Sequence, residues 1–262
     1  MGDGGEVVVN VVFCSQSGSP GVSVWSVLVP GLWPSDDALE RVVVEADIDG
    51  GVMGARYRLD SKTDQLIAAA PRWEGDSSSV DVSRFSARVS DRSWLVPGPR
   101  SPESASRLWR ADDGARSVAS MAAMDRRMWL FDVGRARPDG VLGPVFDEAA
   151  CVVLFVRGAA EELAKVRSRL AALKRTGAHV MVAVTGSTDH GHAEVTEFLG
   201  SPHVHFLPDD GHLIDDSRLV WSGRRSRRRS VWAAGSSLAG AISEVLEYSP
   251  RGVMRVGSAE AR

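Results

Sequence analysis

Lysine is the charged residue that this chain has least of. Only three of the 31 basic residues are lysine (Lys62, Lys165 and Lys174). Chemistry that needs a lysine near the N-terminus is therefore excluded. Arginine-favouring codon usage in a GC-rich genome explains a general shortage, but not the residue found at one particular position. The 34 acidic residues bring the net charge to −3, so no overall polycation points to nucleic acid.

Cysteine and long apolar runs are also scarce. The two cysteines, Cys14 and Cys151, lie inside apolar β-branched runs, which is typical of buried thiols in core strands. No run approaches the roughly 18 apolar residues that span a membrane. The first residues are acidic where a signal peptide is basic. We therefore expect a cytoplasmic location, with peripheral attachment to a membrane left open.

The remaining composition, with 44% hydrophobic and 25% charged residues, is that of a globular protein. Apolar runs predict strands at 7–14, 42–47, 93–97, 128–134, 150–156, 179–184 and 204–207. Helices are predicted at 22–29, 63–70, 101–109, 115–124, 159–174, 192–199 and 231–248. This alternation predicts an α/β fold with a doubly wound, mainly parallel central sheet flanked by helices.

The chain is expected to form a single domain over residues 1–248. A polar, Ser-rich stretch at about 71–93 predicts a surface excursion, and residues 249–262 predict a flexible tail. In a parallel sheet, the loops that follow the strands meet at one edge, where ligands bind. We expect five loops to meet there, carrying Gly18 and Gly21, Asp47 and Asp49, Asp132 and Gly134, Thr185 and Gly186, and Pro208 and Asp209.

The first of these loops has the form of a phosphate-binding loop without its lysine. Such a loop uses glycines to turn backbone N–H groups toward phosphate, a lysine for the terminal phosphates and a hydroxyl for magnesium. The stretch Ser17-Gly-Ser-Pro-Gly-Val-Ser-Val24 keeps both glycines and a hydroxyl at Ser23. Val22 stands where the lysine belongs, and no arginine precedes Arg41 to replace it.

Over residues 6–248 the chain resembles the MinD/ParA family of deviant-Walker (SIMIBI) P-loop ATPases. The resemblance is carried by the order and spacing of the glycine loop, Glu-Ala-Asp-Ile-Asp-Gly-Gly51, Leu95-Val-Pro-Gly-Pro99, Leu130-Phe-Asp-Val-Gly-Arg135, Cys151-Val-Val-Leu-Phe-Val-Arg157, Val180-Met-Val-Ala-Val-Thr-Gly186 and Phe206-Leu-Pro-Asp209. Active members carry the loop Lys-Gly-Gly-Val-Gly-Lys-Thr-Thr. Here its signature lysine falls on Ser17, its Walker lysine on Val22 and its magnesium-binding threonine on Ser23, so the Walker A loop is degenerate.

The resemblance implies a set of site residues. Asp47 and Asp132 take the catalytic positions, Glu45 pairs with Asp47, and Ser23 and Asp132 would hold magnesium. The positions that would bind nucleotide are Gly18, Ser19, Gly21, Val22, Ser23, Val24, Asp49, Gly134, Thr185, Pro208 and Asp209. The family asparagine expected at Thr185 is absent, which weakens adenine recognition. An acid at a strand end, taken alone, more often has a structural role as a loop cap, whereas Asp47 and Asp132 together suit either role.

The missing cations predict little or no ATP hydrolysis, because such groups neutralise charge that develops on the transferred phosphoryl group. Weak binding of ATP or ADP with Mg²⁺ remains open, and no cofactor is required. The first hypothesis is a degenerate MinD/ParA-like localisation or scaffold factor. Its style is most similar to the actinobacterial TadZ/CpaE-like proteins, which place Flp (Tad) pilus and secretion machinery. The implied partners are a secretion or pilus-assembly ATPase and a second copy of the chain.

Two alternatives remain. One is an active partition or positioning ATPase that uses Asp47 and Asp132 with a replaced cation. The other is a nucleic-acid or anionic-membrane binder with a vestigial nucleotide site. Its candidate surface is the arginine run Arg224, Arg225, Arg227, Arg228 and Arg229, which suits a solvated loop equally well. All six histidines lie between residues 179 and 212, with no spacing typical of a metal motif. Trp25, Trp33 and Trp73 suit either an interface or simple packing.

Overall fold

The computed structural model describes residues 9–18, 21–34, 39–72, 81–201, 203–208 and 229–248. Its centre is an eight-stranded sheet with the strand order β3-β4-β2-β5-β1-β6-β7-β8. The strands are β1 (Asn10–Ser15), β2 (Arg41–Glu45), β3 (Ala87–Ser90), β4 (Ser93–Val96), β5 (Met128–Arg135), β6 (Cys151–Arg157), β7 (His179–Thr185) and β8 (Val204–Leu207). All neighbours are parallel except β3 and β4. The predicted α/β fold with a mainly parallel sheet is confirmed.

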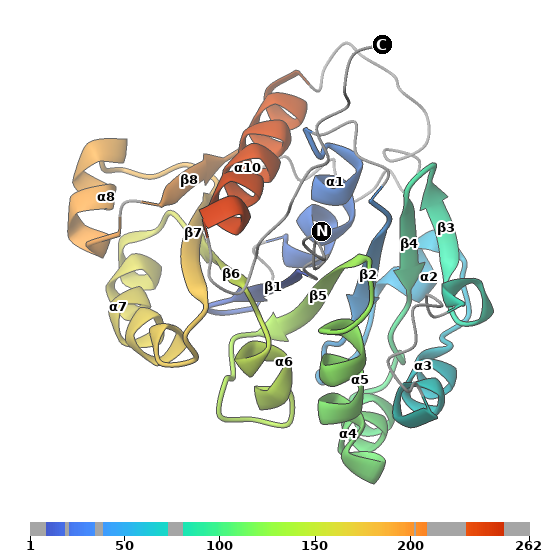
Figure 1. Ribbon diagram of the computed structural model, residues 1–262. Helices are drawn as coiled ribbons and strands as arrows, with labels where there is room; N and C mark the ends of the chain where they lie inside the picture. The colour runs from blue at the N-terminus through green and yellow to red at the C-terminus, as the bar shows by residue number, and fades with distance from the viewer. Residues whose placement is uncertain are drawn as a thin grey trace, which may run out of the picture.

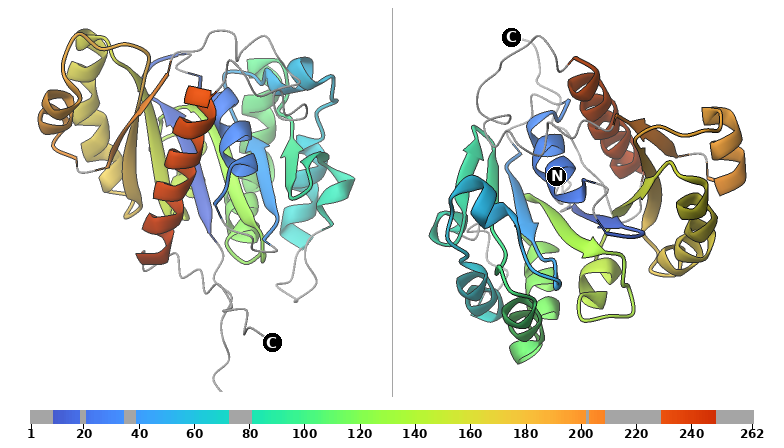
Figure 2. Two further views of the ribbon diagram at one scale, coloured as in Figure 1. Left: turned by 90° about the horizontal axis from the view of Figure 1, so that it is seen from above. Right: turned by 180° about the vertical axis from the view of Figure 1, so that it is seen from behind.

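Helices cover both faces of the sheet (Figure 1). On one face lie α1 (Val22–Gly31) and α10 (Arg229–Tyr248). The other face carries α3 (Thr63–Ala69), α4 (Pro102–Arg110), α5 (Gly114–Ala122), α6 (Gly143–Asp147), α7 (Ala160–Lys174) and α8 (His192–Leu199). Figure 2 shows α1 and α10 side by side in both of its views. The short helix α2 (Met53–Tyr57) follows β2, and single 3₁₀ turns lie at Ala70–Arg72, Val82–Arg84 and Ala111–Asp113.

Two apolar cores lie on opposite faces of the sheet, because successive side chains of a strand point to opposite faces. On β1, Val11 and Phe13 join the core under α1 and α10, whereas Val12 and Cys14 join the core of the other face. Both cysteines are buried and free, as predicted from their apolar surroundings.

The tryptophans on α1 and just after it are core residues. Trp25 is 3% exposed and Trp33 is 8% exposed, and both pack in the core under α1 and α10. The interpretation that these two side chains form an interface is therefore wrong, because both are buried in the core. Trp73 lies outside the described residues.

Three short elements are additions to the predicted ones. The polar stretch at 71–93 contributes β3, an antiparallel strand at the edge of the sheet, within its described part. The helices α2 and α6 have five residues each, too few for an apolar period to be visible in the sequence. Pro30 lies inside α1, which ends one residue later at Gly31.

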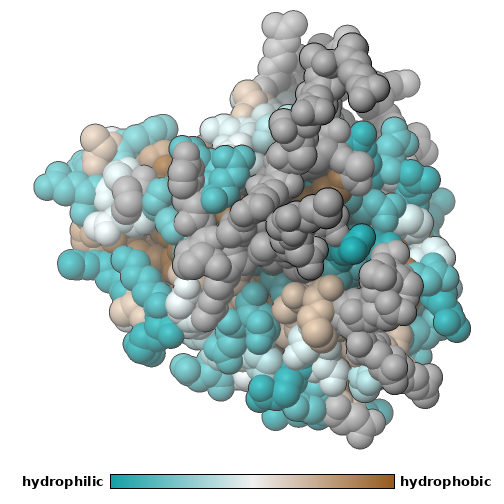
Figure 3. All heavy atoms as spheres, viewed as in Figure 1, coloured by the Kyte–Doolittle hydropathy of each residue, from teal (hydrophilic) through white to brown (hydrophobic). Residues whose placement is uncertain are grey.

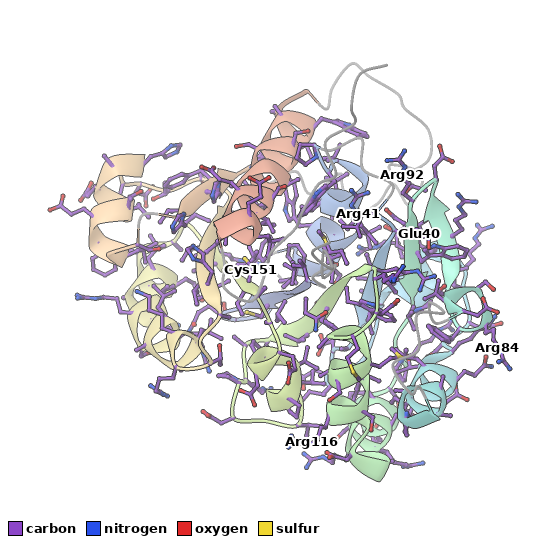
Figure 4. The ribbon with its side chains drawn as sticks, viewed as in Figure 1. Glu40, Arg41, Arg84, Arg92, Arg116 and Cys151 are labelled. Carbon is purple, nitrogen blue, oxygen red and sulfur yellow. The ribbon has the colours of Figure 1, made fainter. Side chains whose placement is uncertain are left out.

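A polar network joins the amino-terminal ends of β2, β4 and β5, at the edge of the sheet away from the predicted site. Arg127 donates to Glu40 Oε2 at 2.8 Å and to Asp125 Oδ2 at 3.1 Å. Trp94 Nε1 donates to Glu40, and Trp129 Nε1 donates to Asp125 at 3.0 Å. Figure 4 shows Glu40 at the start of β2. Ion pairs thus connect these strands at this edge of the sheet. The acids Glu45, Asp47 and Asp132 lie at the opposite edge.

The described surface is predominantly polar on the face seen in Figure 3, where apolar residues form only small areas. None of the helices in the described part of the chain is long and apolar enough to cross a membrane.

Candidate functional site

The carboxyl ends of β1, β2 and β5 enclose a cavity of about 360 Å³. Eight residues with predicted site roles line it: Gly18, Gly21, Val22, Ser23, Val24, Asp47, Asp49 and Gly134. The other lining residues are Ser15, Gly50, Val52, Arg56 and Arg135. The loop after β1, the loop after β2 and the end of β5 therefore meet in one place, because these three strands are parallel neighbours in the sheet.

The first loop presents the start of α1 to the cavity. Gly21 immediately precedes α1 with φ +84°, a left-handed conformation that glycine adopts without strain. Val22, Ser23 and Val24, the first three residues of α1, line the cavity. The Ser15 hydroxyl donates to the Gly134 carbonyl at 3.0 Å and so ties the loop to β5. The N–H groups and partial positive charge of a helix start favour an anion.

Ser17 stands where the resemblance places the signature lysine, and its side chain is used elsewhere. Its hydroxyl donates to the Glu162 carboxylate in the first turn of α7. This hydrogen bond, together with the one from Lys165, lowers the pKa of Glu162. Ser17 is not among the residues that line the cavity. The loop is thus tied to α7 at the position where active relatives carry a cation.

Asp132 is fully buried and does not itself line the cavity, but it lies beside Ser23 and Gly134, which do. Its Oδ1 accepts from the Gly134 N–H at 3.0 Å, whereas its Oδ2 is buried without a hydrogen-bond partner. Burial raises the pKa of Asp132 to about 7, against the lowering effect of the neighbouring Ser23 hydroxyl and of the Gly134 N–H. A buried carboxylate oxygen without a partner is costly, and beside a serine hydroxyl it matches the oxygen ligands that Mg²⁺ prefers. The residues present therefore fit magnesium.

Asp47 lies directly over Gly134. A Cβ on residue 134 would stand 2.2 Å from the Asp47 carboxyl carbon, and Gly134 has φ +63°, so only glycine suits this position. Asp47 Oδ1 accepts from the Asp49 N–H at 2.8 Å. Burial raises the pKa of Asp47. The acid is thus held against the end of β5, facing the cavity.

Glu45 has an internal role. Its Oε1 accepts from the Val52 N–H at 2.6 Å and the Met53 N–H at 2.9 Å, and its Oε2 accepts from the Gly98 N–H at 2.8 Å. The carboxylate joins the loop after β2 to the loop after β4, and it is 1% exposed. Burial raises its pKa despite these hydrogen bonds. Glu45 therefore holds the cavity wall in place and does not face the cavity.

Two arginines line the cavity that reasoning along the sequence missed. Arg56 comes from α2 and Arg135 from the last position of β5. No arginine precedes Arg41 in the sequence, but the fold brings these two side chains to the cavity from later positions. The sequence held one signal for Arg135, which directly follows the Asp-x-Gly segment of Asp132 and Gly134.

Two of the remaining predicted positions, both among the described residues, are not brought to the cavity. The Thr185 hydroxyl donates to the Val156 carbonyl at 3.3 Å, and neither Thr185 nor Pro208 lines the cavity. The predicted residues outside the described part are Ser19, Asp209, Arg224, Arg225, Arg227 and Arg228. Arg229 is the first residue of α10. In the described residues, no three His, Cys, Asp or Glu side chains gather as a metal-binding group.

An eight-stranded, mainly parallel sheet with a glycine loop leading into a helix is the fold of the MinD/ParA P-loop ATPases, and solved structures bear this out. A ParA family ATPase from Chlorobium tepidum matches with a TM-score of 0.72 and 14% identity, covering 89% of this chain and 98% of that one. The septum site-determining protein MinD from Pyrococcus horikoshii, complexed with Mg-ADP, matches with a TM-score of 0.67 and 11% identity, covering 90% and 98%.

The MinC:MinD cell division protein complex of Aquifex aeolicus also matches, with a TM-score of 0.58 and 11% identity, covering 88% of this chain and 96% of that one. At such identities the likeness establishes the fold alone. No family model and no curated protein matches the sequence.

Proposed function

We propose that this chain is a MinD/ParA-like localisation or scaffold protein that binds a magnesium nucleotide weakly and hydrolyses it little or not at all. The observation that carries the proposal is the lining of the cavity. It keeps the glycines, the helix start and the acids of a P-loop site, with Val22 at the lysine position and no lysine among its lining residues. The relative from Pyrococcus horikoshii, which has this fold, is complexed with Mg-ADP.

The residues that would hold the ligand follow from the geometry. Ser23 and the unpartnered Asp132 Oδ2 would hold magnesium, and the start of α1 with Gly18 and Gly21 would face phosphate. When bound, magnesium neutralises negative charge on phosphate oxygens. The chain's own acid for orienting water would be Asp47, held over Gly134. Adenine recognition by Thr185 has no support from its position, because its hydroxyl is hydrogen-bonded inside the sheet.

Slow hydrolysis follows from the charges that the loop lacks. Removal of one donor that stabilises the transition state costs about 3–4 kcal/mol of barrier, or a factor of 10²–10³ in rate. Two loop cations are replaced here, by Val22, which packs in the core at 5% exposure, and by Ser17, which is bound to Glu162. The chain would then act by binding partners and not by turnover.

The partner class that we propose is a pilus-assembly or secretion ATPase of the kind served by TadZ/CpaE-like proteins, with a second copy of the chain as dimer partner. The Aquifex aeolicus relative of this fold forms a complex with MinC, which supports a protein-binding role. The experiment compares the wild type with Asp47→Ala in ATP hydrolysis, and in the cellular position of a fluorescent fusion. We expect negligible hydrolysis and the same position for both proteins. Loss of position in Asp47→Ala would overturn the scaffold role.

An active positioning ATPase is the second candidate, and the arginines of the cavity favour it, because they are cations of the required sign. It predicts magnesium-dependent hydrolysis by the wild type that Asp47→Ala abolishes. A third candidate, binding of nucleic acid or anionic membrane by Arg224–Arg229, is tested by charge reversal of Arg227–Arg229 against DNA and anionic liposomes.

A further inference from the structure

Arg135, at the end of β5, lies against the first loop. Its Nη2 lies 3.3 Å from the point where a Cβ on residue 18 would stand, so a glycine at this position leaves room for the guanidinium. Arg135 is the last residue of β5, three positions after Asp132. One strand therefore carries both the proposed magnesium ligand and a cation that faces the loop. Gly18 and Arg135 both line the cavity.

The positive charge of Arg135 is poorly compensated. Among the described residues its one ion-pair partner, Asp49 Oδ2, lies 3.9 Å from Nη1, and the Arg135 side chain is 54% exposed. Asp47 also interacts with it electrostatically, without an ion pair in the described part of the chain. The same Asp49 oxygen lies 3.1 Å from Arg137 Nη2. Asp49 is thus paired mainly with Arg137, which leaves Arg135 able to bind another anion.

Arg56 adds a second unsatisfied donor to the same cavity. Its Nη1 is buried and has no hydrogen-bond partner. A buried N–H group without a partner costs about 1–3 kcal/mol, more when the group is charged. Because Arg56 lines the cavity, an anionic oxygen bound there would satisfy this group once the side chain turned toward it. Guanidinium groups also match phosphate geometry, because their N–H groups donate in pairs.

We propose that Arg135, assisted by Arg56, supplies the phosphate-binding cations of this cavity in place of the lysine missing from the first loop, and that the ligand is a magnesium-bound di- or triphosphate. The inference rests on the proposed nucleotide site and names the residues that hold its charge. The positive charge comes from the end of the central strand and from α2 instead of from the start of α1. The opposite possibility is that Arg135 fills the phosphate position and blocks it.

The experiment measures binding by calorimetry with two probes, Mg-ADP and Mg-pyrophosphate, the second of which has no base or sugar. We expect Arg135→Ala to weaken binding of both by about tenfold or more, and Arg135→Lys to restore part of the loss. Asp49→Asn should tighten binding, because it removes the carboxylate that competes for Arg135. Arg116→Ala is the matched control, since Arg116 on α5 is exposed, pairs with Asp113 just before that helix and does not line the cavity.

A second readout separates binding from folding. Because Arg135 is half exposed, Arg135→Ala should leave the unliganded melting temperature unchanged and abolish only the increase that Mg-pyrophosphate produces in the wild type. Equal or tighter binding by Arg135→Ala would overturn the proposal and support the blocking role. Absence of wild-type binding at millimolar pyrophosphate would overturn it as well.

The outcomes also separate this inference from the proposed function. Normal binding by Arg135→Ala with negligible wild-type hydrolysis removes the inference and leaves the scaffold function standing. Binding that depends on Arg135, together with rapid hydrolysis, supports the inference and removes the scaffold function.

Discussion

Glu45 and Asp132, two buried carboxylates one strand apart, have opposite hydrogen-bonding states. Glu45 accepts three backbone N–H groups, whereas Asp132 accepts one and keeps a buried oxygen without a partner. They are register neighbours on β2 and β5. A buried acid with all its oxygens satisfied stabilises the fold, and one with an oxygen left over is suited to a ligand. The sequence presents both simply as acids near strand ends.

Glu45→Gln should lower the free energy of unfolding by about 1–3 kcal/mol, because the amide NH₂ of glutamine would face a backbone N–H that now donates to an oxygen. Urea denaturation at neutral pH measures the change. Glu244→Gln, at an exposed position inside α10, is the control and should leave the midpoint unchanged. Equal midpoints for the two variants would contradict a stabilising role for the three hydrogen bonds to Glu45.

Asp132→Asn should change how stability depends on pH. The native pKa of Asp132 is raised to about 7 from the ordinary 3.8, so the native state binds the proton more tightly than the unfolded chain. Wild-type stability from this group is full below about pH 4, is lost as pH rises toward 7, and stays constant above it. The variant lacks this loss. Its free energy of unfolding relative to the wild type should therefore rise through that window, by at most about 1.4 kcal/mol per pH unit. Denaturation series from pH 4 to 8 measure the difference, and a constant difference would refute it.

Among the elements, the two helices that share one face of the sheet meet at a glycine. A Cβ on Gly235 of α10 would stand 2.6 Å from Leu32 Cδ1 and 3.2 Å from the Trp25 ring. Gly240, on the same helix, has no neighbouring atom within 4 Å of its own Cβ position. The two glycines therefore have different uses, one for close packing and the other without a packing reason.

Gly235→Leu should destabilise the protein by about 1–3 kcal/mol, because the new side chain overfills the contact between α1 and α10. Gly240→Ala should stabilise it by up to about 1 kcal/mol, since alanine favours a helix more than glycine does. Thermal unfolding of both variants measures the contrast. Two shifts in the same direction would contradict this packing.

Elements with a clear apolar pattern were predictable from the sequence, and short ones were not. The buried run at 150–156 and the apolar stripe of Leu163, Val166, Leu170 and Leu173 correspond to β6 and α7. The five residues of α2 give no periodic signal, although α2 supplies Arg56 to the cavity. The sequence also does not reveal that β3 pairs antiparallel at the sheet edge, because its alternation is too short and polar.

At the scale of the whole molecule, parallel strand order builds the cavity from segments far apart in the chain. The acids and the first loop could be predicted to meet, since all follow neighbouring parallel strands. The hydrogen-bonding state of Glu45, the role of Ser17 toward α7 and the approach of Arg135 to Gly18 could not. These depend on side-chain contacts between distant elements, which composition and spacing do not encode.

Val22→Lys should give the loop its missing cation and tighten Mg-ATP binding by about tenfold, because Val22 lines the cavity, although the change also removes an apolar side chain from the core. Hydrolysis should stay slow, because Ser17 remains bound to Glu162. Calorimetry and a phosphate-release assay measure the two effects. Val22→Met, similar in length but uncharged, is the control, and equal tightening by both variants would argue against a charge effect.

The hydrogen bonds to the Glu45 carboxylate also allow local opening of the cavity wall to be measured. Its three donors, the amides of Val52, Met53 and Gly98, come from two loops but share one acceptor group. These amides exchange with deuterium when their hydrogen bonds to the Glu45 carboxylate break. We therefore expect a change that loosens this carboxylate to lower the protection of all three amides. Val52 itself lines the cavity. The hydrogen-exchange rate of these three amides therefore reports how often the two loops open, and it can be measured without a ligand.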